Sequence, residues 1–181
     1  MAGERGSSAA GRGEEAPLPP ARLIRLHRHS LTHVLVVGGT AALRDQVARA
    51  FHRESPLRNG AFVPVDCAKD EDRLRVALRA WTGEGGPADP NPLQAAEQGT
   101  LFLDAVERLS LDSQRLLLAL ARRMHGEPGG GSEGPCAGRL VVGNPRTLDE
   151  VVSDGRFLPA LHDAVDKVRV DLEPEAPEAS A

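Results

Sequence analysis

The chain has 181 residues with a formal net charge of −4, and 40% of its residues are hydrophobic. This hydrophobic content is enough for one packed core and excludes a wholly disordered chain, while the scattered lysines and arginines exclude a nucleic-acid-binding protein that relies on overall positive charge. No apolar run approaches the roughly 20 residues of a membrane span, no signal-peptide core is visible, and the two cysteines cannot build a disulfide framework, so we expect a cytoplasmic protein with reduced thiols.

Both ends of the chain differ in composition from the middle. Residues 1–21 and 173–181 are rich in Gly, Ala, Ser, Pro and Glu, and we predict disordered tails because such segments cannot bury enough apolar surface to fold. Residues 22–172 are predicted to form one domain. Within it, the glycine-rich segment 126–138 is predicted to be a flexible loop, because a predicted helix precedes it and a predicted strand follows it.

Apolar runs and helical patterns alternate along this domain. The run HVLVVG (33–38) predicts a buried strand, and a helix is predicted over 43–55. The run AFVPVDC (61–67) predicts a second strand at a sheet edge, because Pro64 lacks the N–H group that a central strand needs. A second helix is predicted over 72–81. The residues expected on the buried faces of these two helices are Leu43, Val47, Ala48, Phe51, Leu74, Leu78 and Trp81.

The second half of the domain continues the alternation. The runs TLFLDA (100–105), RLVVGN (139–144) and DKVRVDL (166–172) predict three more strands. A strong helix is predicted over 111–124, with Ser110 or Asp112 as its cap, and a short helix over 157–165. Apolar strands separated by helices predict a three-layer α/β fold with a parallel sheet covered on both sides. Ligands bind at the carboxyl ends of strands in such folds, so the residues to consider are 38–45, 66–67, 104–107 and 144–146.

Three long segments have a specific pattern: VARAFHRESPLRNGAFVPVDCA (47–68), AEQGTLFLDAVERLSLDSQRLLLAL (96–120) and RLVVGNPRTLDEVVSDGRFLPALHDAVDKVRVDL (139–172). In this order they resemble the central ATPase domain of the sigma-54-dependent transcription activators of the NtrC type, a branch of the AAA+ proteins. The resemblance runs from Val34 to Leu172 and implies the AAA+ α/β subdomain of the P-loop NTPase fold. It implies parallel strands at Val34–Val37, Phe62–Val65, Leu101–Asp104, Leu140–Gly143 and Val168–Asp171.

The phosphate loop of this family follows the pattern GxxGxGK, which aligns with residues 38–44. Gly38 is retained, but Ala41 and Leu43 stand at the other glycine positions, where side chains obstruct the close approach of backbone N–H groups to phosphate. Arg44 replaces the lysine and keeps its charge, but not its point-like ammonium group. Taken alone, Arg44 reads as a solvated residue at a helix start rather than a phosphate contact.

Other functional residues of the family also differ. The acidic pair that binds Mg²⁺ and activates water is here Asp104 followed by Ala105, so the general base is missing, and Asp104 reads as a strand end rather than a metal ligand. The arginines that complete a neighbour's ATP site fall on Leu158 and Ala164, and Asn144 lies one place before the γ-phosphate sensor. The loop GAFTGA has no counterpart between the second and third strands, and we expect neither the helical lid nor a helix-turn-helix segment.

These losses all concern ATP hydrolysis or its output, so we predict a pseudo-ATPase without catalytic residues, metal or cofactor. We expect an interaction, regulatory or scaffold module that binds another protein, without membrane or DNA contacts, as a monomer or small oligomer. The alternative is a weak ATP or ADP sensor without hydrolysis; an ATPase completed by partner residues ranks below both. The residues through which nucleotide binding would remain are Gly38, Gly39, Thr40, Arg44, Asp104 and Asn144.

Two further patterns invite other functions. The cluster His27, His29 and His33 suggests a metal site, but it lacks acidic or cysteine partners at standard spacing, so a surface role is favoured. The turn VVGGT also suggests a dinucleotide-binding fold with Asp66 as its ribose ligand. That motif needs later glycines where this chain has Ala41 and Arg44, so we rank it low.

Overall fold

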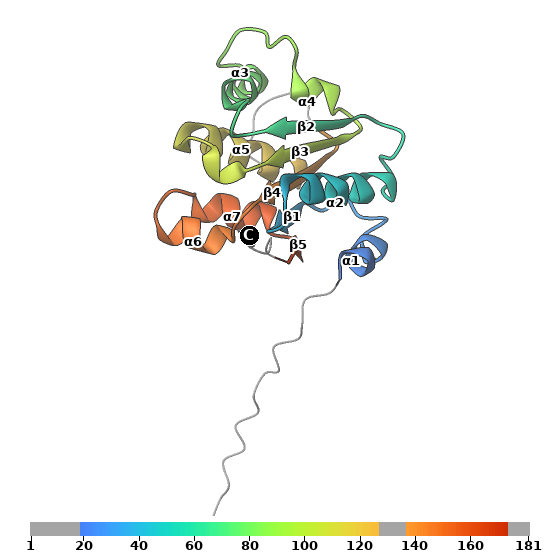
Figure 1. Cartoon of the computed structure of the whole chain (residues 1–181). Coiled ribbons are helices and arrows are strands. Elements are labelled where there is room, and N and C mark those ends of the chain that lie inside the picture. The colour runs from blue at the N-terminus through green and yellow to red at the C-terminus, as the bar shows by residue number, and fades with distance from the viewer. Residues whose placement is uncertain (1–18, 127–136, 174–181) are drawn as a thin grey trace, which may run out of the picture.

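The computed structural model of the chain describes residues 19–126 and 137–173 (Figure 1). The predicted tails and glycine-rich loop therefore lie largely outside the described residues. The strands are β1 (Val34–Val37), β2 (Phe62–Asp66), β3 (Thr100–Asp104), β4 (Arg139–Asn144) and β5 (Val168–Asp171). The helices are α1 (Pro20–Leu26), α2 (Ala41–Arg53), α3 (Glu71–Thr82), α4 (Pro92–Ala95), the 3-10 helix η1 (Val106–Arg108), α5 (Leu111–Met124), α6 (Leu148–Ser153) and α7 (Pro159–Val165).

The described strands form one parallel sheet in the order β2-β3-β4-β1-β5. In this register Val37 pairs with Asn144, and Asp66 pairs with Asp104. The residues that end the strands therefore share one edge of the sheet. Pro64 lies on the edge strand β2, as its missing N–H group predicts.

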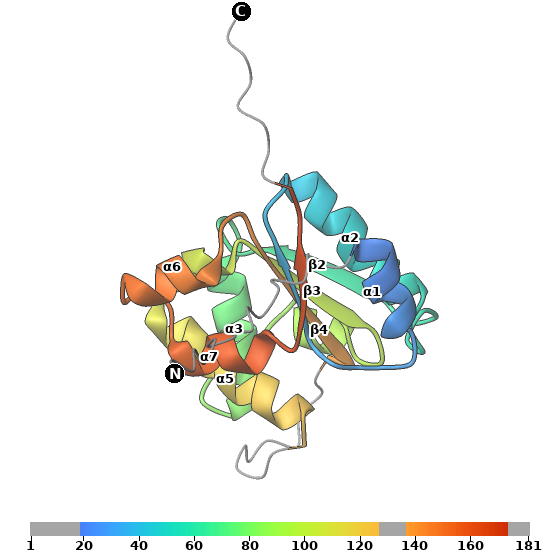
Figure 2. The same cartoon turned by 90° about the horizontal axis from the view of Figure 1, so that it is seen from below.

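Helices cover both faces of the sheet, so the predicted three-layer α/β fold is confirmed (Figure 2). Helices α1 and α2 lie on one side, where Val34, Val36 and Phe102 face them in one buried cluster. Helices α3, α5 and α7 lie on the other side and pack against Leu35 and Leu103. Burial on both faces explains why the strands are apolar without alternation.

The longer helices match their predicted positions. Helix α5 spans the predicted residues, and the Ser110 hydroxyl accepts a hydrogen bond from the Ser113 N–H, which identifies Ser110 as its cap. The predicted core residues Phe51 and Trp81 are buried. Leu43 was expected on the buried face of α2, which is wrong because its side chain is 39% exposed. It lies over the loop beside Gly39 rather than against the sheet.

The sequence pattern did not predict the short helices α1, α4 and α6. Helix α1 starts at Pro20, inside the segment predicted as a tail, because proline suits the first helical position and Leu23 and Ile24 pack on the core. Helices α4 and α6 have four and six residues, too few to produce a clear helical period.

The histidine cluster does not stay together on the surface. His33 is buried, and its Nε2 lies 3.1 Å from the Ala121 carbonyl at the end of α5. The predicted surface role is therefore wrong for His33, because its place directly before β1 puts it under α5. In the described part of the chain, no group of three or more His, Cys, Asp or Glu side chains is arranged to hold a metal ion. No helix within it is long and apolar enough to cross a membrane.

Candidate functional site

The loop after β1 keeps the backbone shape of a tight strand-to-helix turn. Gly38 and Gly39 have φ angles of 86° and 61°, a left-handed conformation that favours glycine. A Cβ atom on Gly38 would lie 2.6 Å from the Leu172 carbonyl oxygen, so the loop also needs glycine for space. The Thr40 hydroxyl accepts a hydrogen bond from the Leu43 N–H at 3.1 Å and caps α2.

Arg44 fills the space inside this loop. Its Nε and Nη2 donate to the two carboxylate oxygens of Asp104 at 2.6 and 3.0 Å. Its Nη1 donates to the carbonyls of Gly38 and Gly39 at 3.0 and 2.7 Å. The Arg44 side chain is only 5% exposed, so the expected solvated residue at a helix start is wrong. The strand-end carboxylate supplies the partner that allows this charge to be buried.

The loop therefore turns carbonyl oxygens, rather than N–H donors, toward the Arg44 guanidinium at its centre. A phosphate-binding loop points backbone N–H groups at the anion. Here the Gly38 and Gly39 carbonyls face a guanidinium, and the Gly38 N–H donates to the Asn144 carbonyl at 2.9 Å. The arrangement satisfies a buried cation rather than an anion.

Asp104 is held in place from behind by β4. A Cβ atom on Gly143 would lie 2.4 Å from Asp104 Oδ1, so a larger residue there would displace the carboxylate. The nearby thiol of Cys67 is buried, and burial together with the Asp104 charge raises its pKa far above the usual range. Cys67 therefore stays protonated and is not a reactive thiol. The second cysteine of the chain, Cys136, lies outside the described residues.

Asn144 connects two loops. Its side chain is buried, and its Oδ1 accepts from the Glu107 N–H at 3.1 Å while its Nδ2 donates to the Arg146 carbonyl at 2.8 Å. The Glu107 carboxylate pairs with Arg146 at 2.9 Å. Both Asn144 amide groups are thus used within the chain, and the Glu107 carboxylate contacts Arg146.

The residue after Asp104 has an unusual backbone. Ala105 lies in the left-handed region, with φ 56° and ψ 46°, and is the N-cap residue directly before η1. This conformation is unfavourable for alanine. The sequence carried no signal for it, since nothing in the residue type indicates a positive φ.

A hollow of about 180 Å³ lies next to Asp104, between the start of α2 and the ends of β2 and β3. Its carboxylates come from Asp45, Asp66 and Asp104, and each has a basic partner: Arg49 at 2.6 Å for Asp45, and Lys69 at 3.3 Å for Asp66. The space that adjoins the loop is therefore lined by acidic groups.

The six predicted site residues thus lie at one edge of the sheet, and their polar groups are bonded within the chain. Arg44 joins Gly38, Gly39 and Asp104, while Thr40 caps α2 and Asn144 bridges the neighbouring loops. The positions where the resemblance expects arginines carry apolar side chains on α7 and at its start. There Leu158 donates its backbone N–H to Gln114, and Ala164 faces α5.

Comparisons with known proteins agree with this fold and this order of segments. The family model of the sigma-54 interaction domain matches residues 19–171. The nitrogen fixation protein VnfA of Azotobacter vinelandii is 31% identical over 168 residues, which cover 88% of this chain and 32% of that protein. The DNA-binding transcriptional regulator NtrC of Escherichia coli K12 is 31% identical over 157 residues, which cover 83% of this chain and 33% of that protein.

Solved structures show the same fold. NtrX from Brucella abortus, solved in complex with ADP, matches with a TM-score of 0.69 and 24% identity over 84% of this chain and 35% of that chain. The P-loop NTPase domain of a sigma-54 activator from E. coli matches with a TM-score of 0.56 and 19% identity, over 79% of this chain and 98% of that domain. The chain spans between 22% and 33% of the length of the curated relatives it matches.

Proposed function

Because the chain belongs to the sigma-54 interaction domain family, with the AAA+ α/β fold of its activators, we propose that it is a pseudo-ATPase that acts through binding another protein. The observation that supports this most directly is Arg44, whose guanidinium occupies the nucleotide loop and pairs with Asp104. Arg44 stands where the family has a phosphate-binding lysine, and its side chain occupies the space in which the phosphate would lie.

The residues present do not fit ATP with Mg²⁺. A triphosphate at this loop needs backbone N–H donors, whereas Gly38 and Gly39 turn their carbonyls to Arg44. Mg²⁺ needs a free carboxylate, whereas both oxygens of Asp104 are bonded to the guanidinium. Binding would require breaking a buried ion pair and reversing the loop, both of which are costly.

Hydrolysis lacks its base as well. Ala105 stands where the family has the glutamate that activates water, and the Glu107 carboxylate is paired with Arg146. Loss of a general base alone lowers the rate by about 10²–10⁴-fold. We therefore assign no catalytic residue to this chain.

The packed core supports a role as a binding module. The fold is retained through two buried clusters and a continuous sheet, so the surface can present a stable shape to a partner. We propose a regulatory or scaffold role in signalling or transcription control, in the cytoplasm, as a monomer or small oligomer. This role rests on the family; the partner's identity would come from cross-linking and mass spectrometry on native cells.

The test is calorimetric titration of the chain with ATP–Mg²⁺ and with ADP. We expect no binding heat at millimolar nucleotide. Micromolar binding that Arg44→Ala abolishes would instead support the nucleotide sensor, in which Gly38, Thr40, Arg44 and Asp104 hold the ligand. Arg49→Ala is the matched control, because Arg49 lies on the same helix and contacts Asp45 and the Phe62 ring rather than these four residues.

A phosphate-release assay separates the sensor from an active enzyme. We expect no turnover above the buffer rate, with or without candidate partners. Turnover that disappears in Asp104→Ala would show that hydrolysis survives and would overturn the pseudo-ATPase proposal.

A further inference from the structure

A basic surface lies on α1 and the residues directly after it. Arg22 and Arg25 on this helix and Arg28 just beyond it are exposed, and together with Leu26 they line one hollow. Leu26 is 62% exposed, so an apolar side chain stands among the cations. These four residues are called the α1 face below.

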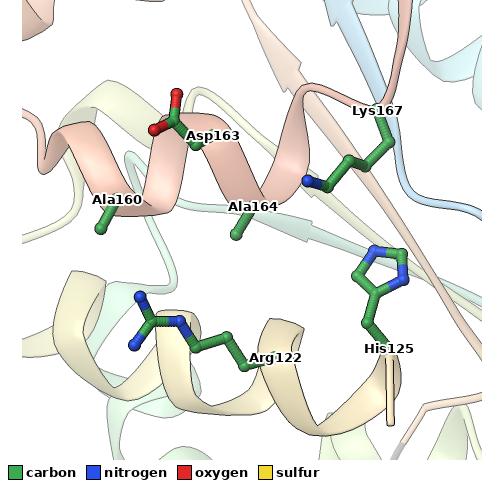
Figure 3. Close-up of a pocket in the computed structure, with 6 residues that line it drawn as sticks. All are labelled: Arg122, His125, Ala160, Asp163, Ala164 and Lys167. Carbon is green, nitrogen blue, oxygen red and sulfur yellow. The ribbon is translucent and has the colours of Figure 1, made fainter. Parts of the chain in front are cut away.

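The stretch of chain that contains the α1 face has no acidic residue. Residues 16–44 include no Asp or Glu, although the whole chain has a formal net charge of −4. The basic side chains between α5 and α7, by contrast, share their hollow with Asp163 (Figure 3). The α1 face therefore differs from the other basic surface in that no local carboxylate offsets its charge.

The guanidinium groups of the α1 face keep most of their donors unused. Arg25 Nε donates to the Ala21 carbonyl at 3.4 Å, and Arg28 Nε donates to the His29 ring at 3.1 Å. Within the described residues, no arginine of the α1 face forms an ion pair with a carboxylate. Each guanidinium has five N–H donors, so the face can still bind carboxylates through several of them.

The C-terminal segment of the chain has the complementary charge. Residues 173–181 read EPEAPEASA, with glutamate at positions 173, 175 and 178 and no basic residue. The N-terminal segment 1–18 also contains glutamates, but it carries Arg5 and Arg12 as well. Of the two ends of the chain, the C-terminal one therefore suits the α1 face better.

The C-terminal segment also starts in the right place. Leu172, the residue before Glu173, packs on the same buried cluster as Leu23 and Ile24 of α1. Strand β5, which ends directly before Leu172, contacts α1. The eight residues after Glu173 can span up to roughly 26–29 Å, whereas a helix of the length of α1 measures about 10 Å. The segment is therefore long enough to reach along the whole α1 face.

We propose that residues 173–181 bind across the α1 face, with their glutamates against Arg22, Arg25 and Arg28. Arginine can donate two parallel N–H groups to one carboxylate. A single exposed pair contributes little, but the covalent link beside α1 keeps the segment at an effective concentration on the order of millimolar. While it is bound, the segment competes with acidic segments of other proteins for this face. The proposal is independent of the pseudo-ATPase proposal, because it uses no residue of the Arg44 loop.

The test is a proximity measurement on the full chain by paramagnetic NMR. A nitroxide label is attached through Ser180→Cys in a Cys136→Ser background, because the Cys67 thiol is buried. We expect the label to broaden the amide signals of α1 more than those of α3 at about 0.01 M salt, where the Debye length is about 30 Å. The broadening should disappear at about 1 M salt, where the Debye length is about 3 Å.

Charge variants of the segment identify the interacting groups. Glu175→Gln/Glu178→Gln should reduce the broadening of the α1 signals. Glu14→Gln/Glu15→Gln is the matched control, because it removes the same charge from the N-terminal segment. It should leave the broadening unchanged.

Variants of the helix complete the comparison. Arg22→Gln/Arg25→Gln should reduce the broadening as the glutamate variant does. Arg73→Gln, which removes an exposed arginine from α3, should not. Circular dichroism checks that each variant keeps the fold of the parent chain.

A synthetic peptide of residues 173–181 then probes the α1 face from outside. We expect it to shift the α1 signals of Glu175→Gln/Glu178→Gln at a lower concentration than those of the parent chain, whose own segment competes. Equal concentrations for the two chains, or broadening that survives about 1 M salt, would overturn the proposal.

Other occupants of the α1 face would give different results. Broadening that transfers from a labelled chain to an unlabelled, isotope-enriched chain in a mixture would assign the contact to a second copy. Loss of broadening in Glu14→Gln/Glu15→Gln alone would assign it to the N-terminal segment. Peptide binding without broadening in the labelled chain would assign the face to an acidic segment of another protein. Each of these outcomes would overturn the proposal.

Discussion

Arg44 and Asp104 form a bidentate ion pair that joins the first turn of α2 to the end of β3, with Nε–Oδ1 at 2.6 Å and Nη2–Oδ2 at 3.0 Å. The pair is nearly buried, with side-chain exposures of 5% and 13%. Since Arg44 also holds the Gly38 and Gly39 carbonyls, one side chain ties loop, helix and strand together. The loop after β1 is thus tied to α2 and β3 through the Arg44 side chain.

Removing the guanidinium should therefore destabilise the fold. Arg44→Met leaves the Asp104 carboxylate buried without a partner, and we expect the free energy of unfolding to fall by about 3 kcal/mol. The double variant Arg44→Met/Asp104→Leu should recover most of this loss, because no unpaired charge remains. Urea denaturation followed by circular dichroism measures all three proteins.

An exposed ion pair on the same helix provides the comparison. Arg49→Met breaks the pair with Asp45 and the contact of the guanidinium with the Phe62 ring, 4.4 Å from its centroid. Because Arg49 is 45% exposed, the cost should stay below about 1 kcal/mol. Equal losses in Arg44→Met and Arg49→Met would contradict the structural role of the buried pair.

The close contact between Gly143 and Asp104 gives a second prediction. A methyl group on Gly143 would meet Asp104 Oδ1 at 2.4 Å and the Phe102 ring at 3.1 Å. We expect Gly143→Ala to cost about 2 kcal/mol, in the range of overpacked cores, and to cost less in an Asp104→Ala background. Gly86→Ala is the control, because no atom lies within 4 Å of its Cβ position. Additive effects of Gly143→Ala and Asp104→Ala in urea denaturation would argue against this contact.

The fold was readable from the sequence because its signals are local and repeated. The apolar runs at β1, β3 and β4 end within a residue of their predicted limits, and α5 carries both its period and its Ser110 cap. The sequence pattern gave wrong or no predictions for very short helices and for the first turn of a helix. Helices α4 and α6 are too short to show a period, and Leu43 matched the apolar face of α2 although it lies in the first turn, beside the loop.

The sequence predicted which residues lie at the site but not how they contact each other, because those contacts join segments that are far apart in the chain. The resemblance located Arg44 and Asp104, but nothing near Arg44 in the sequence indicates a carboxylate 60 residues away. Local reasoning therefore predicted a solvated arginine. The same limit applies to His33, whose burial results from the end of α5, 88 residues later.

Ala105 carries strain that glycine should relieve. An L-residue in the left-handed conformation costs about 1–2 kcal/mol, while the added freedom of glycine in the unfolded chain offsets about 0.4–1 kcal/mol. We expect Ala105→Gly to raise the free energy of unfolding by about 0.5–1 kcal/mol. Ala119→Gly, in the middle of α5, should lower it by about 1 kcal/mol. A loss of stability in both variants would mean that Ala105 is not strained.

His33 should make the stability of the fold depend on pH. Its pKa is lowered from 6.5 to about 4 in the folded chain, by burial and by the cations around it. Between these two values the unfolded chain binds a proton that the folded chain does not, so stability is full above pH 6.5 and falls as the pH drops toward 4. The loss from this one group is on the order of 3 kcal/mol, and it levels off below the folded pKa.

The difference between two proteins isolates this contribution from the carboxylates, which titrate in the same range. His33→Gln retains an N–H donor for the Ala121 carbonyl but cannot be protonated. Its free energy of unfolding, measured by urea denaturation from pH 7 to pH 4, should therefore fall less steeply than that of the parent chain. His29→Gln should follow the parent curve, because His29 is exposed. If all three curves coincide, the buried imidazole does not carry the pH dependence.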